Sequence, residues 1–561
     1  MIIRIFSLLI LLSFASYSAT YYVSLNGNDN NDGLSLENAF ATPGFASKAM
    51  SNGDTLLILS GDYLMSVYYD DMITPPAGLN NRFTVIRGIG NTKPRLIGKG
   101  ENGLGLLCAI DLGGNSNILV ENLEITSLID SPYSGGFRDG IENFASEDWE
   151  KISNIILSNI LIHHIEETAI NLSGNAENII IKNCHLHHTG GTLISSAYHS
   201  AGSGWKNVLI DSCLLEYAGR YFRGKEQNSE WDRPDGIGIE ISEGPFEIRN
   251  CVSQFNLGDG FDSKAHNTYI HHCVSANNFA DGIKLWGDSA RVENCLIYGI
   301  GGGNPESSPW VSLILECDRE NYYAELTNLT IHDGSPRRHY LGTINYGLDN
   351  NSTVLIRNCL FQGASNRFYS SPNVKLILKN NIFGTTGESI LLEAMGQEFD
   401  ANSIKELGVG NFFADADFVN PTWGKIGNFH LKQTSPAIDK GILETGIPLT
   451  DLDYKPRPKM NGVDIGCYEY DPESDIDYVV LLGSKIEIYP NPASNFFNIL
   501  SDVYISSVEI LNLQGISQLK LNQEFYGQHS IDINELPNGF HIVKIKTKND
   551  VIMKPLIKIS N

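Results

Sequence analysis

A short strand-like segment recurs along most of the chain, and this repetition constrains the fold more than any other feature of the sequence. Each copy alternates apolar and polar residues with the two-residue period of a β-strand, and most copies end in Asn followed by a small or apolar residue. Equivalent positions of successive copies lie 22, 24 or 29–38 residues apart, with Gly and Asn between them, which predicts a right-handed parallel β-helix with a common core and variable loops. The copies are residues 117–123, 154–160, 178–184, 208–213, 246–251, 269–273, 291–295, 325–329, 354–359 and 376–381.

Helical hairpins repeated every 22 residues are excluded, because they need a 3.6-residue apolar period and few glycines, whereas this chain has 54 Gly. Eight asparagines share one register near the ends of the copies. We expect them to form a ladder that satisfies backbone groups at an inner bend. They are Asn122, Asn159, Asn183, Asn250, Asn294, Asn328, Asn358 and Asn380.

The cysteines follow the same repeat. Cys251, Cys273 and Cys295 recur every 22 residues in one local context, and the total of nine is odd. In an exported chain a disulfide framework is the alternative. The fixed period instead predicts free thiols stacked in the interior of the repeat.

The charge balance limits the possible partners. The chain has 40 Lys+Arg against 65 Asp+Glu, a formal net charge of −25, which disfavours nucleic acid because phosphate binding needs clustered cations. An acidic polysaccharide would need a bound cation to be held by such a protein.

The amino-terminal segment predicts export. Arg4 precedes an apolar run and then small residues up to Ala19, so residues 1–19 are interpreted as a secretory signal peptide. No later segment approaches 18 uninterrupted apolar residues, which predicts a soluble mature protein without a transmembrane segment. We expect a monomer.

The β-helix is expected to span residues 20–470. Residues 21–33 and 53–56 resemble the usual opening of secreted β-helix proteins and would cap an open strand edge. Residues 435–439 and 463–466 resemble their usual finish. An acidic linker at 471–483 follows.

The last part of the chain has two distinctive motifs, Tyr-Pro-Asn-Pro at 489–492 and Leu-Pro-Asn-Gly at 536–539. With the strand-like runs between and after them, residues 484–561 resemble the type A sorting domain of type IX secretion, a small β-sandwich. This resemblance implies export across the outer membrane by the type IX machinery, removal of the domain, and a secreted or cell-surface location. A carbohydrate-binding module is the alternative for this segment.

Three consecutive turns carry the residues that could bind a metal ion or catalyse a reaction. In a solenoid, residues one period apart stack about 4.8 Å apart, so the Asp-Gly pairs at Asp235, Asp259 and Asp281 form one column where the strands begin. Alternation turns residues 237, 261, 283, 239, 263 and 285 inward. The outward columns are Gly238–Asp262–Lys284 and Glu240–Lys264–Trp286.

Stacked carboxylates repel one another unless a cation intervenes, and Ca²⁺ suits several carboxylate oxygens in irregular geometry. The sequence therefore predicts a calcium site at Asp235, Asp259, Asp262 and Asp281. Lys284 is the candidate general base for abstracting the C5 proton of a uronate, which calcium would acidify by neutralising its carboxylate. Trp286 offers a flat face for a sugar ring, and Lys264 and Glu240 are further candidate substrate-binding residues.

The sequence Asp-Gly-Phe-Asp at 259–262, followed by Asp-Gly-Ile-Lys-Leu-Trp-Gly at 281–287, resembles the active-site region of the family 9 polysaccharide lyases. That family comprises calcium-dependent β-helix pectate and rhamnogalacturonan lyases. The resemblance implies that Asp235, Asp259 and Asp262 are calcium ligands and Lys284 is the base. Gly258 stands where the family usually has an acidic residue, for which Asp281 could substitute, and Lys264 has no counterpart in the pattern.

Other interpretations remain open. Asp-Gly is common turn chemistry, so the aspartates could be purely structural; Lys264 could be an ordinary salt-bridged residue, and Lys284 a solvated lysine. A glycoside hydrolase using the aspartates as acid and base, or a noncatalytic glycan-binding surface protein, are the competing functions.

Two further clusters stand outside this region. The pairs His163-His164 and His187-His188 lie one turn apart and could bind a transition metal or be solvated turn residues. Arg337 and Arg338 are candidates for holding substrate carboxylates or sulfates, or are part of a solvated loop.

Overall fold

The computed structural model describes most of the chain. The described residues are 18–67, 70–99, 106–128, 136–143, 151–172, 174–196, 204–222, 225–226, 233–304, 310–317, 321–333, 340–346, 351–363, 367–385, 390–472, 486–489, 493–512, 516–522, 525–547 and 551–558. They divide into two compact units, one comprising Met1–Tyr269 with Leu285–Ala290 and the other Ile270–Lys284 with Arg291–Asn561.

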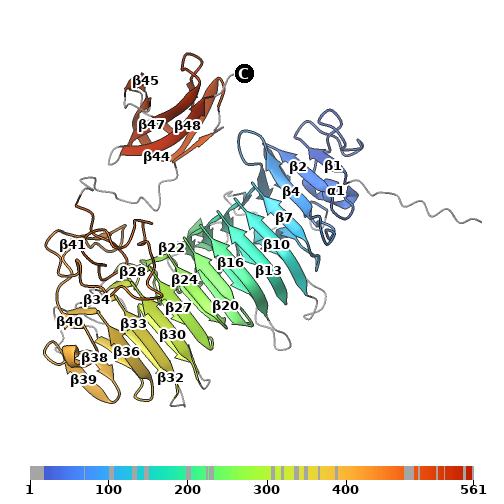
Figure 1. Cartoon of the computed structure of the whole chain (residues 1–561). Coiled ribbons are helices and arrows are strands. Elements are labelled where there is room, and N and C mark those ends of the chain that lie inside the picture. Colours follow the sequence, from blue (N-terminus) through green and yellow to red (C-terminus); the bar gives the residue numbers. More distant parts are fainter. Residues whose placement is uncertain are drawn as a thin grey trace, which may run out of the picture. The chain divides into compact units, whose positions relative to one another are not determined.

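The first unit is built from three parallel sheets, A, B and C, in which each turn of the chain from β4 onward adds one strand to each sheet (Figure 1). Sheet A contains, in spatial order, β1 (Thr20–Val23), β2 (Thr55–Leu59), β4 (Thr84–Ile89), β7 (Ile118–Glu121), β10 (Ile152–Ser158), β13 (Ala176–Lys182), β16 (Trp205–Asp211) and β21 (Phe246–Arg249). Sheet B contains β3 (Asp62–Met65), β5 (Arg95–Gly98), β8 (Glu124–Ser127), β11 (Leu161–Ile165), β14 (His185–Thr189), β17 (Leu214–Ala218) and β22 (Val252–Gln254). Sheet C contains β6 (Leu106–Asp111), β9 (Phe137–Glu142), β12 (Ile170–Asn171), β15 (Ile194–Ser196), β20 (Ile237–Ser242) and β23 (Phe261–Ala265).

Two small elements complete this unit. The helix α1 (Pro43–Ala49) packs against β1 and β2 at the amino-terminal end. The antiparallel pair β18 (Tyr221–Phe222) and β19 (Lys225–Glu226) follows β17, and β18 contacts β11 and β14. The strands β24 (Thr268–His271), β26 (Ile283–Leu285) and β27 (Ser289–Glu293) contain residues of both units.

Register explains why the alternating sequence folds in this way. Ile155, Ile179 and Val208 are paired across β10, β13 and β16, and all three are buried. Each apolar side chain therefore stacks on its equivalent in the next turn, so burial of apolar area stabilises every copy through its neighbours. The inward residues predicted at 237, 239, 261, 263, 283 and 285 are all buried, which confirms the predicted alternation.

The eight predicted ladder asparagines all have left-handed backbones, with φ between 48° and 59°. Asn tolerates this conformation better than most residues, which accounts for its recurrence at the turn. The predicted ladder is confirmed in part: Asn159 donates to the side chain of Asn122, which donates to the Gly88 carbonyl, whereas Asn183 is exposed, so this position is not an inner bend. Buried Asn256 instead satisfies inner backbone groups, because it accepts from the Ala218 amide and donates to the Leu215 carbonyl.

The prediction of free cysteines is confirmed for the eight whose side chains are described. All eight are buried, and none forms a disulfide within the described part of the chain. Burial raises the pKa of Cys359 to about 12, so this thiol is held in its protonated form. These cysteines act as small interior side chains.

The second unit continues the same sheet types. Its strands in sheet A are β30 (Tyr323–Thr327), β33 (Thr353–Arg357) and β36 (Lys375–Lys379). Those in sheet B are β25 (Val274–Ala276), β28 (Leu296–Tyr298), β31 (Thr330–Asp333), β34 (Leu360–Gly363), β37 (Ile382–Thr385) and β40 (Phe412–Phe413). Those in sheet C are β29 (Leu313–Cys317), β32 (Tyr340–Tyr346), β35 (Arg367–Ser370), β38 (Ile390–Ala394) and β39 (Gln397–Asp400), followed by the 3-10 helix η1 (Ile404–Glu406) and the hairpin β41 (Phe418–Asn420) and β42 (Asn428–Leu431).

Residues 440–470 cover the asparagine column of this unit. Asn294, Asn358 and Asn380 donate side-chain hydrogen bonds to the carbonyls of Thr450, Ile442 and Lys440. A fully buried ion pair between Arg457 and Glu469 lies in the same segment. The segment is therefore an integral part of the unit.

The remaining strands form a separate antiparallel sheet: β43 (Ile486–Tyr489), β44 (Phe496–Leu511), β45 (Ser517–Leu521), β46 (Phe525–Asp532), β47 (Gly539–Thr547) and β48 (Val551–Lys558). The long strand β44 pairs with β43, β45, β46 and β47, and buried residues such as Phe497, Ile510 and Ile545 form the core. Within the described residues, no helix is long and apolar enough to cross a membrane.

Candidate metal centre and active site

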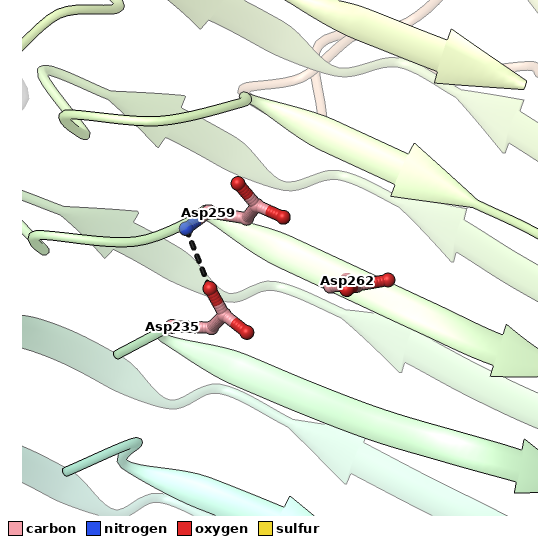
Figure 2. Close-up of side chains that lie close together, drawn as sticks. All are labelled: Asp235, Asp259 and Asp262. Carbon is pink, nitrogen blue, oxygen red and sulfur yellow. Dashed lines mark hydrogen bonds between the residues drawn. The ribbon is translucent and has the colours of Figure 1, made fainter. Parts of the chain in front are cut away.

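Three aspartates of the first unit converge on sheet C. One carboxylate oxygen from each of Asp235, Asp259 and Asp262 lies within 4.8 Å of the other two (Figure 2). Asp259 and Asp262 are buried and Asp235 is partly buried. Their carboxylate oxygens are thus close enough to one another to share a metal ion.

The repeat positions these side chains. Asp235 and Asp259 each stand two residues before a strand of sheet C, and Asp262 lies on β23 opposite Gly238 of β20. A Cβ at Gly238 would lie 3.0 Å from Asp235 Oδ2, so the missing side chain leaves room for the Asp235 carboxylate beside Asp262. Asp235 Oδ1 accepts the backbone N–H of Asp259 at 2.7 Å, as Figure 2 shows. Asp235 therefore also stabilises the turn before β23, which is the structural role that the sequence left open for the Asp-Gly aspartates.

A cation of the chain already touches this group. Lys264 Nζ lies 2.8 Å from Glu240 Oε1 and 3.6 Å from Asp262 Oδ2, and its side chain is 26% exposed. Lys264 thus forms the salt bridge that was the alternative interpretation of this residue. The same contacts place it beside a predicted metal ligand.

Trp286 belongs to the same unit. Its backbone N–H donates to the Ser263 carbonyl at 2.9 Å, which places it next to β23, and the side chain is 37% exposed. Its partial exposure is compatible with contact to a ligand.

Asp281 and Lys284 belong to the second unit. Asp281 is buried, and its Oδ1 accepts the backbone N–H of Val311 at 2.8 Å, the same type of turn bond that Asp235 makes. Lys284 lies on β26 and interacts electrostatically with Glu316 of β29. Burial raises the pKa of Glu316, while the Lys284 ammonium opposes that rise. Their predicted roles as calcium ligand and base stay predictions, and Arg337 and Arg338 lie outside the described residues.

Sequence reasoning missed one charged cluster on sheet C of the first unit. The guanidinium of Arg138 lies 2.8 Å from Glu142, 3.2 Å from Asp139 and 3.7 Å from Glu167. Burial, reinforced by Asp139, raises the pKa of Glu142 to about 7. The strand register could have revealed this cluster. Through Asn171 and Ser195, Glu142 occupies the same column of sheet C as Gly238 and Asp262.

The aspartate donor set suits a hard cation. It offers carboxylate oxygens from three residues and no sulfur or imidazole, which is the ligand type that Ca²⁺ prefers and soft transition metals do not. Asp235, Asp259 and Asp262 are therefore the residues that could hold calcium.

Comparison with known families identifies the carboxyl-terminal part. Residues 487–559 match the family model of the secretion system C-terminal sorting domain. This confirms the predicted sorting domain, and the protein is exported by type IX secretion to the cell surface or the surrounding medium. No curated protein matches the sequence.

Solved structures resemble the chain over most of its length. The complex of XylC with xylose aligns with 81% of this chain and 98% of its own, at 11% identity and a TM-score of 0.52. The A-module of the mannuronan C-5 epimerase AlgE4 from Azotobacter vinelandii is 13% identical, covers 65% of this chain and 89% of its own, and has a TM-score of 0.43. Pectate lyase Pel9A is 13% identical, covers 81% and 97%, and has a TM-score of 0.39. At these identities the likeness concerns the fold.

Proposed function

We propose that this protein is a secreted, calcium-dependent lyase that cleaves an acidic, uronate-containing, pectin-like polysaccharide by β-elimination. The observation that carries the proposal is the convergence of Asp235, Asp259 and Asp262 within 4.8 Å on the outer face of a parallel β-sheet.

Charge gives the proposal its physical basis. A chain of net charge −25 repels a polyuronate, and three converging carboxylates repel it locally. Bound at these aspartates, Ca²⁺ would reverse that local repulsion and would acidify the C5 proton of a uronate by neutralising its carboxylate.

The chain's own residues have separate roles in this proposal. The neutral amine of Lys284 takes the C5 proton, and the electron pair forms the C4–C5 double bond. The C4–O bond to the leaving sugar breaks, and the leaving oxygen takes a proton from water. Trp286 supplies an apolar face for a sugar ring, and Lys264 and Glu240 contact the substrate beside Asp262. Arg337 and Arg338 are further candidates for binding acidic groups of the polymer.

The test uses the secreted protein and a panel of acidic polysaccharides, with absorbance near 235 nm reporting the unsaturated product. We expect activity that is lost with a chelator and restored by Ca²⁺. Lys284→Ala should lower kcat by about 10²- to 10⁴-fold, the usual contribution of a general base. Lys375→Ala, which changes an exposed lysine of β36, is the matched control and should retain full activity.

Each competing outcome has its own signature. Saturated reducing ends without absorbance at 235 nm, lost in Asp→Asn variants and kept in Lys284→Ala, would establish the glycoside hydrolase instead. Deuterium incorporation at C5 from D₂O without chain cleavage would show proton abstraction without elimination. Binding without any product would favour the noncatalytic protein.

A further inference from the structure

Two pairs of adjacent histidines lie on neighbouring strands of sheet B in the first unit, away from the aspartates. Within each pair the two Nδ1 atoms face each other, at 2.6 Å for His163 and His164 on β11 and at 2.8 Å for His187 and His188 on β14. The pairs are in register, and the rings stack across the strands. His163 lies parallel to His187 at a centroid distance of 4.9 Å, and His164 lies nearly parallel to His188 at 5.2 Å.

The backbone explains how neighbouring side chains converge. Successive residues of a strand point to opposite faces, but His164 and His188 have left-handed φ values of 55° and 52°. This turn brings each second ring back beside the first. The sequence repeat therefore places four imidazoles in one cluster.

A carboxylate fixes the proton of one ring. Glu124 Oε1 lies 3.2 Å from His163 Nε2 and is held by Arg95 Nε at 2.8 Å. A carboxylate accepts, so His163 Nε2 is the donor of this hydrogen bond. His163 Nδ1 then faces His164 Nδ1 at 2.6 Å and Thr126 Oγ1 at 3.2 Å. Histidines that bind metals are commonly oriented by a carboxylate on the other ring nitrogen in this way.

All four histidine side chains are partly buried. Neutral imidazole is the form that binds metal ions, since a protonated ring has no free lone pair.

Tyr221 of β18 covers one side of the cluster. Its ring packs edge-on against His164 at a centroid distance of 5.1 Å, and the side chain is 1% exposed. Within the described residues, the Tyr221 hydroxyl is buried without a hydrogen-bond partner. A buried hydroxyl without a partner is costly, so the layer over the histidines holds an unsatisfied polar group.

We propose that His163, His164, His187 and His188 bind one divalent first-row transition ion of the Zn²⁺, Co²⁺, Ni²⁺ or Cu²⁺ class. Imidazole nitrogen suits these ions, whereas Ca²⁺ prefers oxygen, so this site and the aspartate site select different metals. The pairs lie one strand apart, so side-chain rotation must draw them together on binding. The bound ion would then link β11 to β14.

The chain contains an internal control. His271 and His272 form a third adjacent pair with an Nδ1–Nδ1 distance of 2.9 Å. This pair has no stacked histidine pair in the described neighbouring turns, and His272 stacks on Tyr454 instead. Two nitrogens alone bind these ions more weakly than four.

The experiment titrates Co²⁺ into the metal-free secreted protein and follows the visible absorption of the bound ion, with calorimetry of Zn²⁺ binding in parallel. We expect one equivalent to bind, and binding to be lost in His163→Ala/His187→Ala. His271→Ala/His272→Ala and Asp259→Asn should bind as the unaltered protein does. Glu124→Gln keeps all four imidazoles and should weaken binding by about 10- to 100-fold.

Two results would overturn the proposal. One is the absence of Co²⁺ and Zn²⁺ binding to the unaltered protein. The other is binding that survives in both His163→Ala/His187→Ala and Glu124→Gln. Circular dichroism of each variant separates loss of the site from loss of the fold.

Discussion

At the scale of single residues, Lys264 occupies a position with two consequences. Its ammonium is shared between Glu240 and Asp262, so it balances negative charge that would otherwise accumulate on this face of sheet C. The same positive charge lies beside a proposed calcium ligand. It therefore competes electrostatically with any cation held by Asp262.

This competition predicts the effect of removing the charge. Lys264→Met should tighten Ca²⁺ binding about 3- to 10-fold, corresponding to roughly 1 kcal/mol for a partly screened ion pair, as isothermal calorimetry would measure. Lys264→Arg should restore the original affinity. Lys206→Met, which breaks a comparable pair with Glu243, is the control and should leave affinity unchanged. Weaker Ca²⁺ binding in Lys264→Met would mean instead that Lys264 holds Asp262 in place.

The convergence of the three aspartates was predictable from the sequence. The Asp-Gly pairs share a fixed position in the repeat, and the strand register stacks equivalent positions of successive turns. The Lys264–Glu240 pair was predictable in the same way, but the interaction of Lys284 with Glu316 was not. Glu316 comes close to Lys284 across a connection of unequal length. Such contacts depend on loop length and side-chain direction, which the alternation of residues does not specify.

At the scale of elements, the segments that cover the sheets show the limits of sequence reasoning. The strands follow the repeat closely, since each predicted copy overlaps a strand of sheet A. By contrast, β18 and residues 440–470 have no periodic signal and are positioned by specific contacts such as that of Asn358 with Ile442. The ladder asparagines could be located from the sequence, but their partners could not.

A further contact, between His332 of β31 and the segment that contains β41 and β42, depends on pH. His332 of β31 accepts the indole N–H of Trp423 on Nδ1 at 3.2 Å, and its ring packs against Phe418 and Phe429. Burial lowers the pKa of His332 from 6.5 to about 4, although Asp415 opposes this.

Between pH 6.5 and pH 4, His332 is therefore protonated in the unfolded chain but not in the folded chain. Its contribution to the free energy of unfolding is complete above pH 6.5 and is lost as the pH falls toward 4. Replacing His332 with Phe should reduce the loss of unfolding free energy between pH 7 and pH 4.5 by about 1–3 kcal/mol, as denaturant titrations would show. Parallel pH profiles of the two proteins would contradict this assignment.

At the scale of the whole molecule, export depends on the carboxyl-terminal sheet. Its core is built around β44 and β47, and Ile545 is fully buried there, whereas Ile516 is 63% exposed. A charge at Ile545 should unfold the sheet, because an unpaired buried charge is expensive.

We therefore expect Ile545→Asp to keep the protein in the cell, with at least about tenfold less in the medium, while Ile516→Ser is exported normally. Immunoblots of periplasmic, surface and medium fractions would measure this. Mass spectrometry of the exported form should also show loss of the predicted signal peptide and sorting domain. Normal export of Ile545→Asp would show that sorting needs only the extended sequence and not the folded sheet.

The buried thiols have a consequence for how such a protein can be made. Within the described part of the chain, eight cysteines lie inside and none is cross-linked, so the fold is held by stacked strands and requires no oxidation step. The polypeptide can thus mature without a disulfide isomerase, and a reducing cytosol should serve for its production as well as an oxidising compartment does. An oxidant that reached the interior would find thiols one turn apart, so the integrity of the stack is also what protects the protein from wrong cross-links.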